Sequence, residues 1–434
     1  MPKEQIIYGD SIAYQCPSPS PDAKFAIPGT ILSGNPGVWA IDEGLLSRHM
    51  LMLGAIGAGK SNATYHLIQK LRTSMTTNDV MFIFDTKGDY YNQFYRRGDI
   101  VISNDERATD GAQANYWNLF QEIRIDSRYL ENTVEIVKAI FAEKLERSSQ
   151  PFFPNAAKDL LRALIMYIIR NKQQFPAGGD NAMLLDALQT VEPQAFVDLL
   201  RASKDTKAMV PYIEDSKSGQ ALGVLSELQQ GTTDVLIGNF AKKGTLSMRD
   251  LVRRKGGKVV FIEYDLSIGS VLGPIYQLLF DLAIKEALSR RKNEGNVYFI
   301  IDEFRLLPKL THIDDGVNFG RSLGAKFIIG VQNVEQVFHV YGEELARSML
   351  SGFSTTISFR LNDYKSREFV KNLAGANGRV TSYESGNKVK GLVEQYRDTT
   401  VIQDYDVNSL KIGEALILRN GNPPFRFRFR EFGK

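Results

Sequence analysis

Short, mostly apolar runs alternate with longer amphipathic segments along much of this chain, a pattern that predicts buried strands interleaved with helices. The runs occupy residues 50–53, 80–84, 258–264, 297–301, 326–331, 355–360 and 415–419. Strands that are apolar on both faces are typical of a mainly parallel sheet covered by helices. The pattern therefore predicts an α/β fold.

The pattern changes between residues 119 and 240, where strand signals fade and apolar residues recur at helical spacing. Helices are predicted at residues 130–141, 155–170, 180–187, 193–201 and 219–229. We expect an all-α insertion over residues 119–245. It divides the α/β core into a first part, residues 1–118, and a second part, residues 246–434, in which a long helix is predicted at residues 273–291.

Both ends of the chain have patterns of their own. Proline and glycine punctuate residues 1–50, which predicts short strands that form a lid or an edge sheet. Residues 377–400 are polar and contain glycine, so we expect an exposed hairpin or loop. Residues 425–432 alternate phenylalanine with arginine. This alternation predicts a half-buried edge strand, although interleaved aromatic and arginine side chains can also bind single-stranded nucleic acid.

The strand at residues 50–53 is followed by G-A-I-G-A-G-K-S and then by a predicted helix, residues 62–73. This is the phosphate-binding pattern G-x-x-x-x-G-K-[ST] in its usual context. Glycines let backbone N–H groups curl around phosphate oxygens, while Lys60 can reach the β- and γ-phosphates and Ser61 can hold Mg²⁺. The sequence thus predicts an ATP and Mg²⁺ site whose loop residues are Gly54, Ala55, Ile56, Gly57, Ala58, Gly59, Lys60 and Ser61.

A second motif, V-Y-F-I-I-D-E at residues 297–303, has the form of a Walker B strand: an apolar run that ends in two carboxylates. We expect Asp302 to hold Mg²⁺, directly or through water. Glu303 follows the metal ligand by one residue, so it can reach and polarise the water that attacks the γ-phosphate.

Three further side chains are candidates for the same site. Asp85 follows the strand at residues 80–84, so it lies either near the nucleotide or at the start of the next helix as a cap. Gln332 ends the strand at residues 326–331, where it can sense the γ-phosphate or simply be a polar strand terminus. Arg321, on a predicted helix, is either an arginine finger for a neighbouring subunit or an ordinary surface residue.

Composition excludes several classes of site. Cys16 is the single cysteine, so disulfide frameworks and cysteine-based metal sites are excluded. The net charge of +3 argues against a broadly basic coat for nucleic acid but not against a local basic channel. Residues 242–243 and 253–255 are candidates for such a channel, with solvated surface as the alternative.

Nothing in the sequence predicts a membrane segment. No apolar run approaches the ~18 residues that span a bilayer, and the first residues lack the apolar core of a signal peptide. We expect a soluble, cytoplasmic protein.

Taken together, these motifs resemble the coupling-protein ATPases of conjugation and type IV secretion, the VirD4/TraD/TrwB group, and more distantly the HerA–FtsK translocases. The resemblance covers nearly the whole chain. It is carried by the phosphate loop (residues 48–61), I-F-D-T-K-G-D-Y (83–90), F-Y-R-R-G-D (94–99), Y-W-N-L-F (116–120), I-I-D-E-F-R-L-L-P-K-L (300–310), G-R-S-L-G-A-K-F (320–327) and G-V-Q-N (330–333).

The resemblance implies a P-loop NTPase core of RecA-like type with an all-α domain that meets substrate. It also implies a hexameric ring in which Arg321 acts across the subunit boundary and Gln332 senses nucleotide. The expected function is ATP-driven delivery of conjugative DNA or nucleoprotein to a type IV secretion channel. The expected partners are DNA of either strandedness, a relaxase or another secreted protein, and channel components. Members of this group typically begin with transmembrane helices. Either a separate membrane anchor recruits this chain to the inner membrane as a further partner, or the sequence is a piece of a longer protein, or the protein is a soluble relative.

Two other functions remain open from the sequence. One is a soluble HerA-like DNA motor in repair, packaging or defence. The other is a platform that recruits relaxase or effector proteins without hydrolysing ATP, which the intact Lys60, Ser61, Asp302 and Glu303 argue against.

Overall fold

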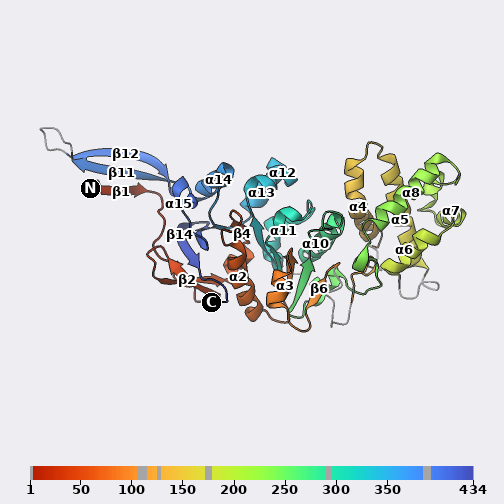
Figure 1. Ribbon diagram of the computed structural model, residues 1–434, viewed down its shortest axis with the longest axis horizontal. Coiled ribbons are helices and arrows are strands. Elements are labelled where there is room, and N and C mark those ends of the chain that lie inside the picture. The colour runs from red at the N-terminus through yellow and green to blue at the C-terminus, as the bar shows by residue number, and fades with distance from the viewer. Residues whose placement is uncertain are drawn as a thin grey trace. The chain divides into compact units, whose positions relative to one another are not determined.

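The computed structural model describes residues 3–104, 115–124, 129–171, 178–289, 295–384 and 392–433. The chain forms two compact units (Figure 1). The first comprises residues 1–82, 291–306 and 313–434, and the second comprises residues 83–290 and 307–312. Both have α/β character, as the alternation of apolar runs and amphipathic segments predicted.

A mixed sheet forms the centre of the first unit. Its strands lie in the order β3-β2-β14-β13-β10-β4-β9-β8, in which β10, β4, β9 and β8 are parallel and the others antiparallel. The strands are β2 (Ala23–Ile31), β3 (Pro36–Asp42), β4 (Met50–Leu53), β8 (Val297–Ile301), β9 (Ala325–Val331), β10 (Thr355–Ser358), β13 (Glu414–Arg419) and β14 (Asn422–Phe429). The parallel strands are buried along their whole length. Strands β4 and β8 are apolar throughout, whereas β9 contains Lys326 and β10 reads T-T-I-S.

Strand β14 is not an edge strand, contrary to the prediction from its alternation of phenylalanine and arginine. It lies between β13 and β2, and β3 is the edge of this part of the sheet. Phe425, Phe427 and Phe429 are buried against Trp39, with ring centroids 6.3, 6.4 and 6.3 Å away. The alternation of phenylalanine and arginine indicates a strand with one buried face. It does not indicate an edge strand, because a strand with one buried face can pair with a neighbour on each side.

Three helices of the first unit begin at a capping side chain: Asp42, Asn333 and Asp363 each accept a hydrogen bond from a backbone N–H of the first turn. The helices are α1 (Glu43–Ser47), α2 (Lys60–Ser74), α11 (Ile313–Phe319), α12 (Val334–Tyr341), α13 (Glu343–Ser351), α14 (Tyr364–Ala374) and α15 (Asp404–Asn408), with 3-10 turns η5 (Phe304–Leu306) and η6 (Gly320–Leu323).

A separate three-stranded antiparallel sheet contains β1 (Lys3–Tyr8), β11 (Ala376–Glu384) and β12 (Leu392–Thr400), in the order β1-β11-β12 (Figure 1). A hairpin or a loop was predicted at residues 377–400, and β11 and β12 form a hairpin there. Residues 385–391 lie outside the described ranges.

Strand β5 (Val80–Asp85) begins in the first unit and ends in the second. In the second unit, β6 (Ile100–Ile102) and β7 (Lys258–Glu263) pair in parallel. The accompanying helices are α3 (Asp89–Phe94), α9 (Met248–Arg254) and α10 (Gly273–Leu288). The helix predicted at residues 273–291 therefore ends slightly earlier, and residues 290–291 lie outside the described ranges.

The predicted helical insertion belongs to the second unit. Its elements are η2 (Leu119–Glu122), α4 (Tyr129–Arg147), α5 (Phe152–Arg170), α6 (Asn181–Thr190), α7 (Pro193–Arg201), η3 (Lys207–Tyr212), α8 (Gly219–Thr233) and η4 (Gly238–Ala241). Helices α4 to α8 lie together (Figure 1). No strand interrupts its described residues, 119–124, 129–171 and 178–245.

The chain enters and leaves this helical part side by side. Asn118 N donates to Leu246 O (3.0 Å), and Leu246 N donates to Tyr116 O (3.0 Å). Glu122 is fully buried nearby and accepts hydrogen bonds from Trp117 Nε1 and Met248 N (2.8 and 2.6 Å). The two segments that flank the helical part, residues 116–118 and 246, therefore lie side by side. Within the ranges that the structure describes, none of the helices is both long enough and apolar enough to span a bilayer.

Candidate nucleotide site

The phosphate loop joins β4 to α2. Gly57 and Gly59 have φ values of 71° and 115°, which favour glycine, and α2 begins at the next residue, Lys60. A side chain at Gly59 would also meet the backbone of Gly413 at 2.8 Å. The loop therefore needs glycine both for its turn and for close packing. The first N–H groups of α2 have no partner within the helix, and with the helix dipole they suit a phosphate.

Lys60 lies against the loop rather than in solvent. Its Nζ donates to Gly54 O (2.6 Å) and to Ala55 O (3.4 Å), and the residue is 8% exposed. Both acceptors belong to the loop itself, so the ammonium group is already where phosphate oxygens would bind.

Ser61 and Asp302, predicted as metal ligands, lie together. Ser61 Oγ donates to Asp302 Oδ2 at 2.7 Å, and Thr64 Oγ1 is 3.5 Å from the other carboxylate oxygen. Gly330 on the adjacent strand β9 lets Asp302 approach, because a side chain at Gly330 would overlap the backbone of Asp302. Hydroxyl and carboxylate oxygens beside a phosphate loop fit Mg²⁺, which prefers oxygen ligands and phosphate.

Glu303 and Gln332, from the ends of neighbouring strands, also lie together. Gln332 Nε2 is 3.0 Å from Glu303 Oε1 and 3.1 Å from Oε2. Arg305 Nε forms an ion pair with Glu303 Oε1 at 3.3 Å. The predicted water-polarising carboxylate is thus held between an amide and a guanidinium group.

Asp85 belongs to the second unit, and residues of the same unit position its side chain. It is buried, and it accepts hydrogen bonds from Tyr91 N (2.8 Å) and Lys87 N (3.3 Å) at the start of α3. Burial raises its pKa, while these N–H groups oppose the rise. These contacts favour the capping alternative for Asp85.

Arg321 and Gln332 lie at opposite ends of β9. Arg321 is exposed on the 3-10 turn η6, where a helix was predicted, immediately before β9. Gln332 follows the strand. Seven residues of strand separate these ends, a span of about 20 Å. The phosphate loop follows β4, which is parallel to β9, so it lies at the same end as Gln332. Arg321 is therefore remote from the phosphate loop of its own chain.

Three of the five basic residues considered for a nucleic-acid channel have local partners. Lys242 lies over the ring of Tyr116, 5.1 Å from its centroid. Arg253 pairs with Glu286 at 2.9 Å and Arg254 with Asp250 at 3.1 Å. Lys243 is exposed and Lys255 is buried. These contacts account for Lys242, Arg253 and Arg254 without nucleic acid.

Several supporting residues were missed from the sequence. Arg305 follows Glu303 by two residues, and Gly330 lies within the G-V-Q-N segment. Both could therefore have been identified from the sequence around the motifs. Asn62 and Gly413 were not, because each acts through a contact with a distant part of the chain.

Comparison with known proteins places this geometry in a family. Residues 35–406 match the model of the type IV secretion-system coupling protein DNA-binding domain. Coupling protein TraD of Escherichia coli (strain K12) is 23% identical over 339 residues, which cover 76% of this chain and 44% of TraD. The coupling protein VirD4 of Bartonella henselae is 23% identical over 350 residues, which cover 76% of this chain and 54% of VirD4. The chain thus spans about half the length of these relatives.

Solved structures show the same fold. Plasmid coupling protein TrwB in complex with the non-hydrolysable GTP analogue GDPNP has a TM-score of 0.70 at 19% identity, over 99% of this chain and 95% of TrwB. The TrwB complex with the ATP analogue ADPNP has a TM-score of 0.69 at 19% identity, over 98% of this chain and 94% of TrwB. With the match over residues 35–406, this chain belongs to the family of type IV secretion-system coupling proteins defined by that DNA-binding domain.

Proposed function

We propose that this chain is an ATP-driven DNA translocase that acts as a coupling protein, delivering conjugative DNA or nucleoprotein to a type IV secretion channel. The observation that carries the proposal is the 2.7 Å contact between Ser61 and Asp302 at the phosphate loop. Two oxygen ligands for Mg²⁺ from distant segments meet beside Lys60, as nucleotide hydrolysis requires.

We assign phosphate binding, Mg²⁺ binding and proton acceptance to different residues of the site. The loop N–H groups and Lys60 bind and orient the phosphates, with Lys60 exchanging its contacts to Gly54 and Ala55 for phosphate oxygens. Ser61 and Asp302 would hold Mg²⁺, which would supply positive charge that neutralises the phosphates. Glu303 accepts a proton from the attacking water, and Gln332 fixes the orientation of the Glu303 carboxylate.

The position of Arg321 favours a site completed by a second subunit. It lies at the opposite end of β9 from Gln332, so its charge is available to the γ-phosphate of a neighbour rather than to its own. An arginine finger supplied by a neighbouring molecule stabilises the charge of the transition state. A closed ring, with six subunits as the family resemblance implies, would give each site such a neighbour.

The family also guides the proposed partners. We propose DNA as the translocated polymer, with a relaxase or another secreted protein as cargo and channel components or a membrane anchor as the docking partner. The helical part of the second unit is the proposed contact for protein cargo. The working location is the cytoplasmic face of the inner membrane.

The experiment that tests this function measures ATP hydrolysis by the purified chain with no DNA, with single-stranded DNA and with double-stranded DNA. We expect DNA-stimulated hydrolysis that requires Mg²⁺. Tight ATP binding without any hydrolysis, with or without DNA, would favour the recruitment platform instead.

A further inference from the structure

The proposed catalytic carboxylate Glu303 and the proposed arginine finger Arg321 lie at the two ends of one stretch of chain. Between them come η5, residues 307–312 and α11. Glu303, η5, α11 and Arg321 belong to the first unit, whereas residues 307–312 belong to the second. Contacts that hold residues 307–312 within the second unit therefore act on a stretch that carries a site residue at each end.

Asp281, on α10 of the second unit, holds the end of residues 307–312. Its Oδ2 accepts a hydrogen bond from Thr311 N (3.0 Å), and its Oδ1 accepts one from His312 N (3.1 Å). Helix α11 begins at the next residue, Ile313. The two hydrogen bonds thus fix the chain directly before the helix that leads to the arginine finger.

The burial of Asp281 indicates that these hydrogen bonds are the reason for a carboxylate at this position. The residue is 6% exposed, and burial raises its pKa, while the N–H groups of Thr311 and His312 oppose the rise. Taking a carboxylate out of water costs free energy that its hydrogen bonds must offset. An apolar side chain would avoid that cost, but it would accept neither hydrogen bond. Asp281 is therefore suited to fixing the chain rather than to packing.

Residues 307–312 also face α4 of the helical part, through Glu135. Glu135 Oε2 accepts hydrogen bonds from Arg249 Nη2 (2.7 Å) and Lys285 Nζ (3.0 Å). Its Oε1 lies 3.7 Å from His312 Nε2 and makes no hydrogen bond within the described part of the chain. Because such hydrogen bonds form at about 3 Å, a small shift of His312 would close this contact. The position of the segment is thus sensitive to the position of α4.

We propose that Asp281 is a positioning residue for ATP hydrolysis. By holding the chain between Glu303 and Arg321, it sets where both site residues lie. The contact of His312 with Glu135 makes this placement depend on the helical part of the second unit. The inference rests on the proposed function, which assigns chemistry to Glu303 and Arg321. Because a displacement of about 1 Å can lower a rate about 10²-fold, loss of the Asp281 contacts should slow hydrolysis.

The first test measures ATP hydrolysis by Asp281→Asn, which keeps the shape of the side chain. An amide has one acceptor oxygen beside a donor NH₂ group, so it cannot accept from both Thr311 N and His312 N. We expect kcat to fall about 10- to 100-fold with KM unchanged. Calorimetry with a non-hydrolysable ATP analogue should give wild-type affinity and stoichiometry, because Lys60 and Ser61 lie outside the stretch. A loss of folded protein would instead lower the stoichiometry together with kcat.

The second test measures His312→Ala, which removes the ring that faces Glu135 and keeps the backbone N–H that Asp281 holds. We expect kcat to fall about 3- to 10-fold. Combined with Asp281→Asn, the substitution should add little to the loss, because both act through residues 307–312.

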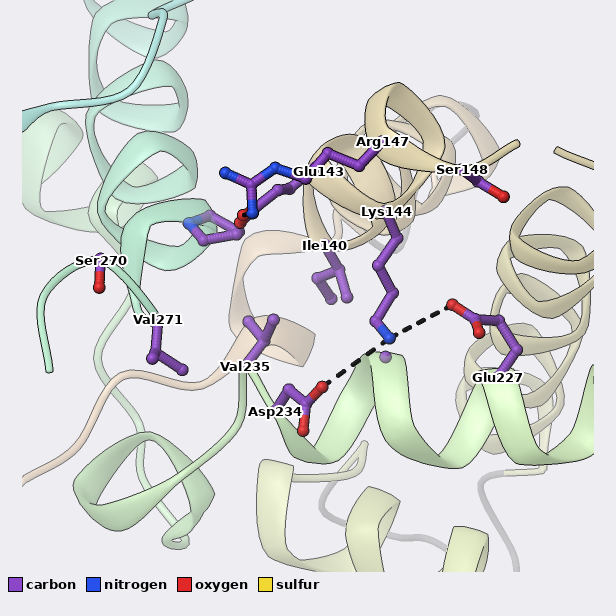
Figure 2. A pocket seen from close by; sticks show the side chains of 12 residues that line it. Ile140, Glu143, Lys144, Arg147, Ser148, Glu227, Asp234, Val235, Ser270 and Val271 are labelled. Atoms are coloured by element: carbon purple, nitrogen blue, oxygen red, sulfur yellow. Dashed lines mark ion pairs between the residues drawn. The ribbon is translucent and has the colours of Figure 1, made fainter. Parts of the chain in front are cut away.

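The matched control on α4 is Lys144→Ala. Lys144 Nζ forms ion pairs with Glu227 Oε1 (3.3 Å) and Asp234 Oδ2 (3.8 Å) at a cavity of about 870 Å³ within the second unit (Figure 2). The substitution breaks ion pairs of α4 that are not made with the stretch. His339→Ala removes an exposed histidine of the first unit and is the control for His312→Ala. Both controls should keep the wild-type kcat.

A mixing experiment examines the Arg321 end of the stretch by itself. Arg321→Ala subunits supply an intact phosphate loop and Glu303, and their partners supply only Arg321. Two partners are compared, Lys60→Ala and the double variant Lys60→Ala/Asp281→Asn. The double variant should restore less hydrolysis, and equal recovery would show that Asp281 does not position Arg321.

The inference is overturned if Asp281→Asn has the wild-type kcat, or if its kcat falls only in proportion to the stoichiometry of analogue binding. A wild-type kcat in His312→Ala overturns the link to the helical part, and it is the deciding result if Asp281→Asn does not fold. If the wild-type chain hydrolyses no ATP, the proposed function itself fails, an outcome distinct from these.

Discussion

Lys60 brings a full positive charge into a loop that otherwise offers backbone groups. We predict that Lys60→Ala lowers ATP hydrolysis by about 10²-fold or more, because the phosphates lose a directed cation. The fold should persist, since the hydrogen bonds that Lys60 Nζ donates go to Gly54 and Ala55 of its own loop. Steady-state phosphate release measures the effect, with Lys70→Ala on the same helix as control. Near-wild-type turnover in Lys60→Ala would show that Lys60 does not contribute to hydrolysis at this site.

Glu303 allows a sharper separation of binding from chemistry. We predict that Glu303→Gln binds ATP with unchanged affinity but hydrolyses it about 10²–10⁴-fold more slowly, because an amide has the same shape but cannot accept the proton. Its remaining carbonyl can still accept a hydrogen bond from Gln332. Affinity and single-turnover rate are the two measurements, with exposed Glu335→Gln as control. Loss of ATP binding would point to a structural role.

Site residues that belong to short sequence motifs could be predicted. Residues whose role depends on contacts with distant parts of the folded chain could not. Lys60, Ser61, Asp302 and Glu303 belong to short patterns whose spacing reflects one geometry. Asp85 shows the limit, since a carboxylate after a buried strand suits a ligand and a helix cap equally, and only its contacts with α3 distinguish the two.

At the scale of elements, β4 is preceded by a buried histidine that resists protonation. Burial holds the pKa of His49 at about 4, with the charge of Arg321 acting in the same direction. Its Nδ1 accepts a hydrogen bond from Phe327 N (3.2 Å). The neutral ring therefore links the beginning of β4 to the beginning of β9.

This histidine should make the protein sensitive to acid. An unfolded chain binds a proton at His49 below about pH 6.5, whereas the folded chain does so only near pH 4, so stability falls as the pH decreases between these values. From pH 7 to 4.5 the loss from this group is about 2 kcal/mol. We predict that His49→Asn, which tolerates the positive φ, lacks this part of the loss. Urea unfolding at the two pH values tests this, and an equal loss in both proteins would contradict it.

Most strands and helices could be predicted because their sequences have clear apolar runs or helical spacing of apolar residues. Strands such as β4 and β8 are continuous apolar runs, and they form as expected. The neighbours of β14 could not be predicted, because its alternation describes its two faces and says nothing of its pairing. Arg321 was expected on a helix, and it lies on the four-residue 3-10 turn Gly320–Leu323, which ends at Gly324 with a φ of 81°.

At the scale of the whole molecule, the account depends on assembly. If Arg321 completes the site of a neighbour, hydrolysis per subunit should rise with protein concentration, and DNA that templates a ring should shift the rise to lower concentration. A monomer should be slower by roughly 10³–10⁵-fold. Constant specific activity across dilution would contradict this prediction.

The most direct test mixes Arg321→Ala with Lys60→Ala, each of which should be nearly inactive alone. In a mixed assembly, an Arg321→Ala subunit supplies an intact phosphate loop and an adjacent Lys60→Ala subunit supplies an intact arginine. Random mixing in equal amounts makes about a quarter of the interfaces complete if they are heterologous. The account predicts that the mixture recovers up to that share of wild-type hydrolysis. A mixture no more active than its two components would show that the site is not completed by a neighbour.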